Sequence, residues 1–558
     1  MRGLPVFSWI PSYDRSWLHG DVIAGLTVWA VLVPEALAYA TIAGVSPVVG
    51  LYAAPGALIL YAAFGSSRHL VTGPMAATAA LSAAAVADLA YPNDFLALTT
   101  ALALVTGIIA VLCGLLRLGF LASFISEPVL KGFIVGLALT IMVGQLPKLF
   151  GVAKGSGNFF EQAWHFLANL GDTSGLTLVV GLLSLALVLG LRRFLPVVPG
   201  SLVAVLLGIA AVRVFSLDQH GVEIVGHIPG GLPSFGLPNV ATHRYLDLSA
   251  SAVGIMLVGF AEGLGAAKTY AVANHYEVDP NREFIGLGAA NIASGLSGGM
   301  VVNGSLSKTA VNAGAGAKSQ LSGLVVAVLT VITLLFLTGL FEKLPEATLA
   351  AVVIAALIEL VDFRTLAALF RVRTRGSGVV YHVAARPDFV AATAALLGVL
   401  IFDTLPGLFI GITMSLVLLL YRASRPHIAL LGRVPGSPET FADVERRPEK
   451  ELIPGIVVLR VEGGLFFANA DTIRVSALRH AAEPGTRAVV LDAETVPFID
   501  VTAATMLAEL AESLHDRGVA FVVAGEMGQV RDVLRATGSE LAPTYPTVPD
   551  AVAALGER

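Results

Sequence analysis

Residues 95–116 read FLALTTALALVTGIIAVLCGLL and contain no charged side chain. A helix that crosses a bilayer needs roughly 20 mostly apolar residues, so this stretch alone is long enough to span a membrane. Residues 319–341 also lack any charge. The whole chain is 56% hydrophobic and 13% charged, with a mean hydropathy of +0.80, whereas soluble proteins are usually about 25% charged. The sequence therefore predicts a polytopic α-helical membrane protein.

The uncharged runs follow one another closely along the first 430 residues, so many helices must be joined by tight turns. Besides the two runs already named, they cover residues 132–147, 176–191, 284–307, 389–402 and 404–421. From their number and spacing we expect about 14 membrane segments.

Composition also excludes several classes of protein. The net charge is −5 and spread along the chain, which argues against nucleic acid as a partner. The single cysteine, Cys113, forms no internal disulfide, and no spacing of cysteine and histidine resembles a metal site. No set of serine, histidine and aspartate is placed as in a hydrolase. We therefore expect no metal, no cofactor and no enzymatic activity.

The sequence pattern changes near Pro435. Residues 436–450 are polar and rich in proline and glutamate, and we interpret residues 431–450 as a linker between a membrane domain at 1–430 and a smaller domain at 451–558. In the smaller domain, β-type runs alternate with amphipathic helical patterns, which is typical of an α/β domain. The expected strands are residues 456–461, 488–491 and 520–524, and the expected helices are residues 502–515 and 528–535.

Arginines indicate which helix ends face the cytoplasm. Six of them lie in one inter-helical loop or directly after the last uncharged run, namely Arg371, Arg373, Arg375, Arg386, Arg422 and Arg425. Positively charged loops stay in the cytoplasm. The smaller domain follows the last two arginines, so we expect it in the cytoplasm, and an even number of spans places the N-terminus there too. Glu359 and Asp403 lie near the ends of runs and are expected at the membrane surface. The expected location is the cytoplasmic (inner) membrane.

Two segments are too polar and too interrupted to be ordinary membrane helices. Residues 71–82 read VTGPMAATAALS, and residues 298–312 read GGMVVNGSLSKTAVN. Each is typical of a short helix that begins partway through the membrane. The start of a helix has free N–H groups and about half a positive charge, so anions bind there readily. Paired broken segments in two halves of a transporter indicate a substrate site, although either segment alone is equally compatible with close helix packing.

Three blocks of motifs occur in the same order as in one known family. They are PEALAYA at 34–40 with AG at 43–44 and GLY at 50–52; NRE at 281–283 with Gly286, ANI at 290–292 and GSLSKTAVN at 304–312; and LFFANA at 465–470 with FID at 498–500. Through these blocks the chain resembles, over nearly its whole length, the sulfate permease family, also called the solute carrier 26 family. The last block is similar to the STAS domain, which is shared with anti-sigma-factor antagonists.

The resemblance implies an architecture that residue spacing alone does not give. Family members have two inverted repeats of seven membrane segments, arranged as a core and a gate domain, followed by a cytoplasmic STAS domain. The family usually forms homodimers and moves anions such as sulfate, bicarbonate, chloride or dicarboxylates. Its third and tenth helices meet end to end at the anion site, beside the first and eighth. Carried over to this chain, the implied substrate-binding residues are Tyr39, Met75, Ala76, Ala77, Ser305, Leu306, Ser307 and Lys308.

Charged residues inside the membrane segments are expected to have a functional role, because placing a charge at mid-membrane costs at least about 2.5 kcal/mol. We predict that Glu262, and second to it Glu35, carries a coupling proton. Lys308 stands where many relatives have arginine, so the positive charge is kept while the planar fork of arginine is lost. Two structural alternatives remain open. Either Lys308 only pairs with a carboxylate, or Glu262 and Lys268 form a fixed pair that orients their helix.

Three functions agree with these residues. The first is secondary active transport of a small anion (sulfate, a dicarboxylate or bicarbonate) by proton symport, with an elevator-like motion of the core domain. The second is uncoupled anion exchange or a channel. The third is a membrane-tethered sensor that acts through the STAS domain. The charges inside the membrane favour transport, with an anion, a proton, the lipid bilayer and a second copy of the chain as partners.

Overall fold

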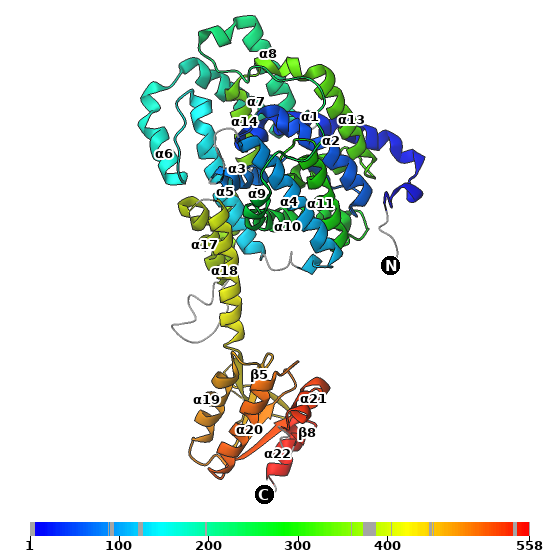
Figure 1. The fold of residues 1–558 in the computed structure, drawn as a ribbon. Helices are drawn as coiled ribbons and strands as arrows, with labels where there is room; N and C mark the ends of the chain where they lie inside the picture. Colours follow the sequence, from blue (N-terminus) through cyan, green and yellow to red (C-terminus); the bar gives the residue numbers. More distant parts are fainter. Residues whose placement is uncertain are drawn as a thin grey trace. The chain divides into compact units, whose positions relative to one another are not determined.

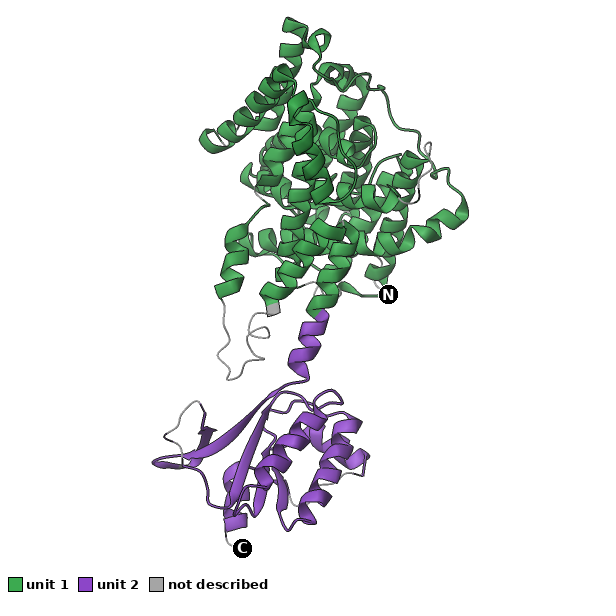
Figure 2. Cartoon of the chain, turned by 90° about the vertical axis from the view of Figure 1, so that its left-hand side faces the viewer, with its two compact units in different colours: residues 1–415 green, residues 416–558 purple. Residues whose placement is uncertain are grey.

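The computed structural model describes residues 6–87, 89, 94–120, 126–195, 198–358, 360–371, 387–402, 404–445, 449, 451–538 and 544–556. Arg373, Arg375, Arg386, Glu359 and Asp403 therefore lie outside the described residues. The chain divides into two compact units, Met1–Ser415 and Leu416–Arg558 (Figure 2). The boundary falls inside helix α18 (Thr404–Ala423).

The membrane unit contains two series of helices that follow the same plan (Figure 1). The first series is α1 (Leu18–Ile42), α2 (Pro47–Phe64), α3 (Ala76–Ala87), α4 (Phe95–Leu115), α5 (Glu127–Phe150), α7 (Gly175–Phe194) and α8 (Gly200–Phe215). The second series is α10 (Ser249–Ala273), α11 (Pro280–Leu296), α12 (Leu306–Gly314), α13 (Leu321–Ile332), α14 (Glu346–Ile358), α17 (Pro387–Phe402) and α18. In each series the third helix is short and follows a three-residue strand, β1 (Val71–Gly73) or β2 (Asn303–Ser305).

This order confirms the predicted fold class, a polytopic helical protein with seven membrane segments in each half. Among the described residues, eight helices are long and apolar enough to cross a membrane unaided. The half-helices α3 and α12 are shorter, as the broken sequence segments predict. Helix α13 continues as a π-helical turn at Thr333–Leu337 and a 3-10 helix at Thr338–Lys343. The remaining short helices are α6 (Phe159–Ala168), α9 (Thr242–Asp247), α15 (Phe363–Arg371) and four 3-10 turns at Ile10–Ser12, Arg15–Trp17, Leu170–Asp172 and Leu217–His220.

The helices of the membrane unit pack as two groups. A core group consists of α1–α4 and α10–α13, and a gate group consists of α5, α7, α8, α14 and α17. The core group packs tightly because small residues let backbones approach each other. A Cβ atom added to Gly107 of α4 would lie only 2.6 Å from the carbonyl oxygen of Gly288 on α11. A substitution at either glycine would therefore push these two helices apart.

The second unit is an α/β domain with one six-stranded sheet in the order β4-β3-β5-β6-β7-β8. Its strands are β3 (His427–Val434), β4 (Ser437–Asp443), β5 (Ile456–Glu462), β6 (Ala488–Asp492), β7 (Ala520–Ala524) and β8 (Thr544–Tyr545). Strand β3 runs antiparallel to β4 and β5, whereas β5 to β8 are parallel. The helices are α19 (Ala470–Ala481), α20 (Val501–His515), α21 (Gly528–Ala536) and α22 (Val548–Gly556). The three strands and two helices predicted for this domain are all confirmed.

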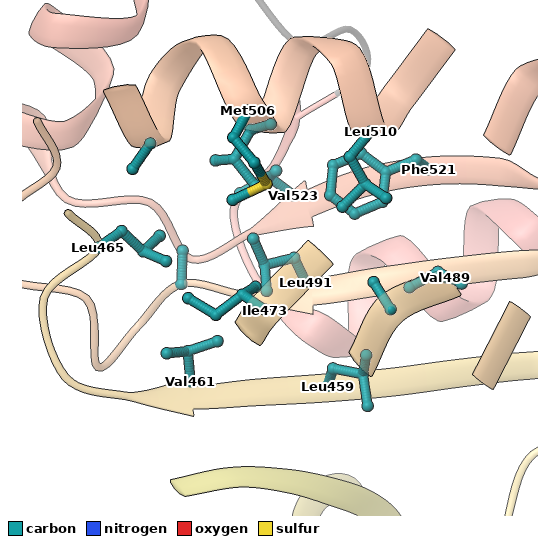
Figure 3. Close-up of a cluster of buried hydrophobic side chains, with 14 of the residues drawn as sticks. Leu459, Val461, Leu465, Ile473, Val489, Leu491, Met506, Leu510, Phe521 and Val523 are labelled. Carbon is teal, nitrogen blue, oxygen red and sulfur yellow. The ribbon is translucent and has the colours of Figure 1, made fainter. Parts of the chain in front are cut away.

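The two faces of this sheet are covered by different helices. Alternate residues of a strand point to opposite faces, so Val457 and Leu459 join one hydrophobic cluster and Val458 joins another. Figure 3 shows the first cluster, in which Ile473 of α19 and Leu510 of α20 lie over the sheet. Helix α22 covers the opposite face.

The prediction that residues 431–450 form a linker is wrong for most of their length. Residues 427–443 form the hairpin of β3 and β4, which turns at Gly436 with φ +80°. The polar composition of residues 437–443 suits an edge strand, which has a neighbour on one side only and needs little apolar burial. Polarity therefore indicated the edge of a sheet rather than the absence of one.

Candidate functional site

The two broken segments meet at a short antiparallel strand pair. Strand β1 pairs with β2, with Val71 opposite Ser305 and Gly73 opposite Asn303. Helix α3 begins three residues after β1, and α12 begins directly after β2. The pairing therefore brings the starts of both half-helices to one place, as the sequence predicts. Because each start has unsatisfied N–H groups and a partial positive charge, the place suits an anion.

Side chains of the neighbouring helices hold the strand pair. On α11, the side-chain amide of Asn291 accepts a hydrogen bond from the N–H of Val302 at 3.0 Å and donates one to its carbonyl oxygen at 2.9 Å. Helix α10 approaches β2 through Gly263, where an added Cβ atom would lie 3.1 Å from the side-chain oxygen of Asn303. Thr309 of α12 accepts a hydrogen bond from the N–H of Val71 at 3.1 Å. These contacts fix where the half-helices begin.

Lys308 of α12 is the cation at this meeting point, and its residue is only 1% exposed. Its Nζ lies 2.7 Å from Oε2 of Glu35 on α1 and donates a hydrogen bond to the carbonyl oxygen of Pro74 at 3.2 Å. The same Nζ lies 5.2 Å from the centre of the Tyr39 ring, which is within the range of a cation–π contact. Lys308 thus joins α1, the start of α3 and α12. Lys308 does pair with a carboxylate, as the structural alternative proposed, but Glu35 is only one of its three contacts.

Glu262 lies on α10 and differs from Glu35 in its contacts. Its Oε2 is buried and makes no hydrogen bond within the described part of the chain. Lys308 is near enough to act electrostatically on this carboxylate. Lys268 is exposed, and among the described residues its amine forms no ion pair with Glu262. The alternative of a fixed Glu262–Lys268 pair is therefore wrong for this structure.

The other predicted site residues lie in the first turns of the half-helices. Ala76 and Ala77 are buried at the start of α3, and Met75 just before it is half-buried. Ser305 caps α12 by accepting a hydrogen bond from the N–H of Lys308 at 3.2 Å.

Leu306 and Ser307 are exposed. The hydroxyls of Ser305 and Ser307 lie 3.2 Å apart. An anion at the helix starts would therefore meet the Ser307 hydroxyl, backbone N–H groups and the Lys308 ammonium.

Two buried carboxylates outside this site hold the connections that lead to it. Glu283 of α11 accepts hydrogen bonds from the Tyr61 hydroxyl at 2.7 Å and from the N–H groups of Ser66 and Ser67 at 2.7 and 3.0 Å. These hydrogen bonds hold the connection between α2 and β1, which leads directly into β1.

Asp21 of α1 plays the same part for the segment that follows α12. It accepts hydrogen bonds from the N–H groups of Lys318 and Ser319 at 2.7 and 3.1 Å, and from the Ser319 hydroxyl at 2.7 Å. Sequence reasoning missed the positioning roles of Asp21, Glu283 and Asn291. The signal was a charged or amide residue inside an apolar helix, but its partner is a backbone group that spacing does not reveal.

Comparison with known sequences places this fold and site in a family. Residues 18–383 match the sulfate permease family, and residues 447–551 match the STAS domain. The chain belongs to the sulfate permease family. It is therefore a multi-pass membrane transporter of anions rather than an enzyme, and its second unit is a STAS domain.

Relatives in this family carry names that concern sulfate. A probable sulfate transporter of Mycobacterium tuberculosis (strain ATCC 25618 / H37Rv) is 39% identical over 531 residues, covering 94% of this chain and 92% of that protein. The chloroplastic sulfate transporter 4.1 of Arabidopsis thaliana is 33% identical over 559 residues, covering 96% of this chain and 79% of that protein.

Solved structures of the family have the same fold. The murine solute carrier 26 family member A9 anion transporter, in its inward-facing state, gives a TM-score of 0.89 at 23% identity and covers 100% of this chain and 94% of that chain. The transmembrane domain of the cyanobacterium bicarbonate transporter BicA gives a TM-score of 0.60 at 23% identity and covers 72% of this chain and 98% of that chain. At these identities the likeness concerns the fold alone.

Proposed function

We propose that this sulfate permease family member is a proton-coupled sulfate transporter of the cytoplasmic membrane. The observation that carries the proposal is the placement of Lys308 between the two half-helix starts, with two carboxylates on the flanking helices α1 and α10. Sulfate is the proposed substrate because relatives at 39% and 33% identity bear that name. We further propose that both termini are cytoplasmic and that the transporter is a homodimer.

The anion binds at the starts of α3 and α12 in this proposal. Ala76, Ala77, Leu306 and Ser307 supply backbone N–H groups, the Ser307 hydroxyl adds a donor, and Lys308 supplies a full positive charge. Tyr39 lies beside the lysine and holds it through its ring. Met75 borders the site as an apolar wall. Such a combination of helix starts and one cation suits a small oxyanion.

The charges at the site explain why a proton accompanies the anion. Within the core group, the two carboxylates Glu35 and Glu262 outnumber the single ammonium of Lys308, so with all three ionised these side chains together disfavour an anion. Glu35 is already paired with Lys308 at 2.7 Å. Among the described residues Glu262 forms no ion pair and its buried Oε2 has no hydrogen-bond partner, so protonation of Glu262 breaks neither kind of contact. Glu262 is therefore our first candidate for the coupling residue.

Glu35 has a different task in this mechanism and remains the second candidate. In the absence of substrate it holds the Lys308 ammonium and limits the cost of burying it. An arriving anion competes with Glu35 for the ammonium. Full transfer of Lys308 to the anion leaves Glu35 uncompensated, so a proton on Glu35 would favour tight binding.

An elevator-like motion would carry this site across the membrane. All the residues that form it lie on α1, α3, α10 and α12 or in the segments directly before α3 and α12, which belong to the core group. Close packing of the core group through Gly107 and Gly288 makes it suited to move as one body. The gate group, which contributes none of the site residues named here, would remain in place.

One observation favours uncoupled anion exchange as a second candidate function. Lys308 is already neutralised by Glu35, so an anion that displaces only this carboxylate needs no proton. The two functions differ in whether a pH gradient alone drives accumulation.

Sulfate uptake into proteoliposomes tests the proposal. Wild-type protein should accumulate sulfate when only an inward proton gradient is supplied. Glu262→Gln should still bind sulfate but lose this accumulation, because it mimics the protonated carboxyl permanently. Glu277→Gln, which changes an exposed carboxylate after α10, is the matched control and should behave as wild type. Unchanged accumulation by Glu262→Gln would remove Glu262 as the coupling residue, and no effect of pH on wild type would favour exchange.

A further inference from the structure

Two short amphipathic helices occupy equivalent positions in the two series of the membrane unit. Helix α6 lies in the chain between the fifth and sixth helices of the first series, α5 and α7. Helix α15 lies between the fifth and sixth helices of the second series, α14 and α17. Both pack against the same pair of helices, α5 and α17. Neither belongs to the anion site.

The two short helices contact α5 at two widely separated levels. Phe166 of α6 packs edge-on against Phe150, the last residue of α5, with ring centres 5.0 Å apart. Leu366 of α15 packs with Val135 of α5 and Ala392 of α17. Val135 and Phe150 are separated by about 22 Å along a helix, at 1.5 Å per residue. Helices α6 and α15 therefore lie near opposite faces of the membrane.

Helix α15 presents three different stripes. Residues three or four positions apart share one side of a helix. Leu366 and Leu369 face the protein. Phe363, which is 56% exposed, shares a second stripe with Phe370. Arg364 and Arg371 share a third stripe and are both exposed, next to the phenylalanines.

Helix α6 repeats this plan without the positive charge. Phe166 faces the protein, and the exposed stripe consists of Phe160, Trp164 and Leu167, with Trp164 74% exposed. The polar side carries Glu161 and His165, and α6 contains neither lysine nor arginine. Tryptophan is typical of the boundary between lipid and water. The two helices thus differ mainly in charge.

We propose that α6 and α15 lie in the two surfaces of the bilayer and that α15 binds the headgroups of anionic lipids. The phenylalanine stripe of α15 enters the acyl region, and Arg364 and Arg371 reach the phosphate layer beside it. This places α15 at the cytoplasmic surface, because positive charge stays on that side. Anionic lipid there would anchor the gate group, to which α5 and α17 belong, while the core group moves.

Lipid fits this surface better than a second protein for two reasons. Helix α17, against which α15 packs, itself exposes the apolar side chains of Leu397 and Ile401, as a helix that faces lipid does. The arginines supply charge that is complementary to a phosphate headgroup rather than to an apolar partner. A second copy of this chain on the same surface would shield the arginines and leave lipid binding independent of them.

Native mass spectrometry of the full-length protein released from nanodiscs tests the proposal. The nanodiscs contain equal amounts of phosphatidylcholine and phosphatidylglycerol, and retained lipids are counted. Wild-type protein should retain phosphatidylglycerol in preference. Arg364→Gln/Arg371→Gln should weaken that retention about 25-fold, at about fivefold for each arginine near an anionic surface. Arg364→Lys/Arg371→Lys keeps the charge and should retain most of the preference.

The matched control is Arg479→Gln/Arg517→Gln, which removes two exposed arginines from the STAS domain and should leave the lipid preference unchanged. All four arginines are exposed, so the variants should fold. A second measurement needs no variant, because raising the salt concentration should weaken phosphatidylglycerol retention by wild-type protein. Retention by Arg364→Gln/Arg371→Gln equal to wild type, or a lysine variant as defective as the glutamine variant, would overturn the proposal.

Discussion

Replacing Lys308 by methionine removes the cation that contacts Glu35 and the start of α3. Methionine keeps the length of the side chain and its apolar stem, so the change is mainly one of charge. The carboxylate of Glu35 loses a partner at 2.7 Å, and the carbonyl oxygen of Pro74 loses its donor. Glu262 loses the ammonium that acts on it. We expect this variant to bind sulfate poorly and to be less stable than the wild type.

The magnitude follows from the burial of the pair. Two unit charges 2.7 Å apart attract by about 6 kcal/mol at an effective dielectric constant of about 20, and desolvation offsets much of this. Removing one partner of a buried pair costs about 3–5 kcal/mol, because the other charge stays buried and uncompensated.

The single cysteine provides the assay. Cys113 lies on α4 in the core group and is buried, so a thiol-reactive dye labels it only when the core group opens. A loss of 3–5 kcal/mol raises the open population, and with it the labelling rate, by about two to nearly four orders of magnitude. Lys318→Met removes an exposed lysine ten residues further on and should label as wild type.

A second variant separates charge from packing. Glu35→Gln/Lys308→Met leaves neither partner charged and should recover much of the lost stability, although sulfate binding should stay weak. Labelling of Lys308→Met at the wild-type rate at pH 7.5 would show that the Glu35–Lys308 pair does not hold the core group together. Equal instability of the single and double variants would assign the loss to packing.

Three further perturbations follow from other contacts. Ser307→Phe places a bulky side chain at the exposed start of α12 and should abolish sulfate binding in a scintillation proximity assay, while Cys113 labelling stays slow. Glu283→Ala removes the acceptor of the N–H groups in the connection before β1, and each unpaired buried group lowers the stability by about 1–3 kcal/mol. This variant should therefore speed Cys113 labelling more than Ser307→Phe does. Hydrogen bonds from Thr365 hold the pKa of Asp362 below its usual value. The ionised Asp362 carboxylate therefore caps α15 at neutral pH, and this cap is lost as the pH falls through the pKa of Asp362. Hydrogen exchange in α15 should rise at low pH, and Asp362→Asn should remove that pH dependence.

The sequence predicted those parts of the fold in which one segment carries its own signal. Uncharged runs located the helices, and Gly73 with Pro74 marked a break that the structure turns into the start of α3. The linker prediction failed because polarity alone does not separate an exposed edge strand from a loop. Strand β4 gains its neighbours from β3, and that pairing depends on the rest of the sheet.

The sequence predicted which residues belong to the candidate site but not which of them contact each other. Lys308, Tyr39 and Glu262 were expected near one another through a family resemblance, whereas Glu35 was expected only as the second candidate for the coupling proton. The choice of Glu35 rather than another carboxylate as the partner of Lys308 depends on two helices far apart in sequence. No helical spacing relates such residues, so only the three-dimensional structure assigns the pair. For the same reason the sequence identified Glu283 only as part of a family motif and did not predict its hydrogen bonds to backbone N–H groups.

The two series supply the site with similar backbones and unequal charges. In each series the first helix bears an acid at the anion site, Glu35 or Glu262, whereas the second buried acid of α1, Asp21, holds the segment after α12. The third residue of the half-helix is Lys308 in α12 but Thr78 in α3. One ammonium thus faces two carboxylates, and it can neutralise only one of them by direct contact. The symmetry of the fold places the helix starts together, and the difference between Lys308 and Thr78 leaves Glu262 without an ion pair among the described residues. Proton coupling would therefore originate in the side chains that break the symmetry between the repeats.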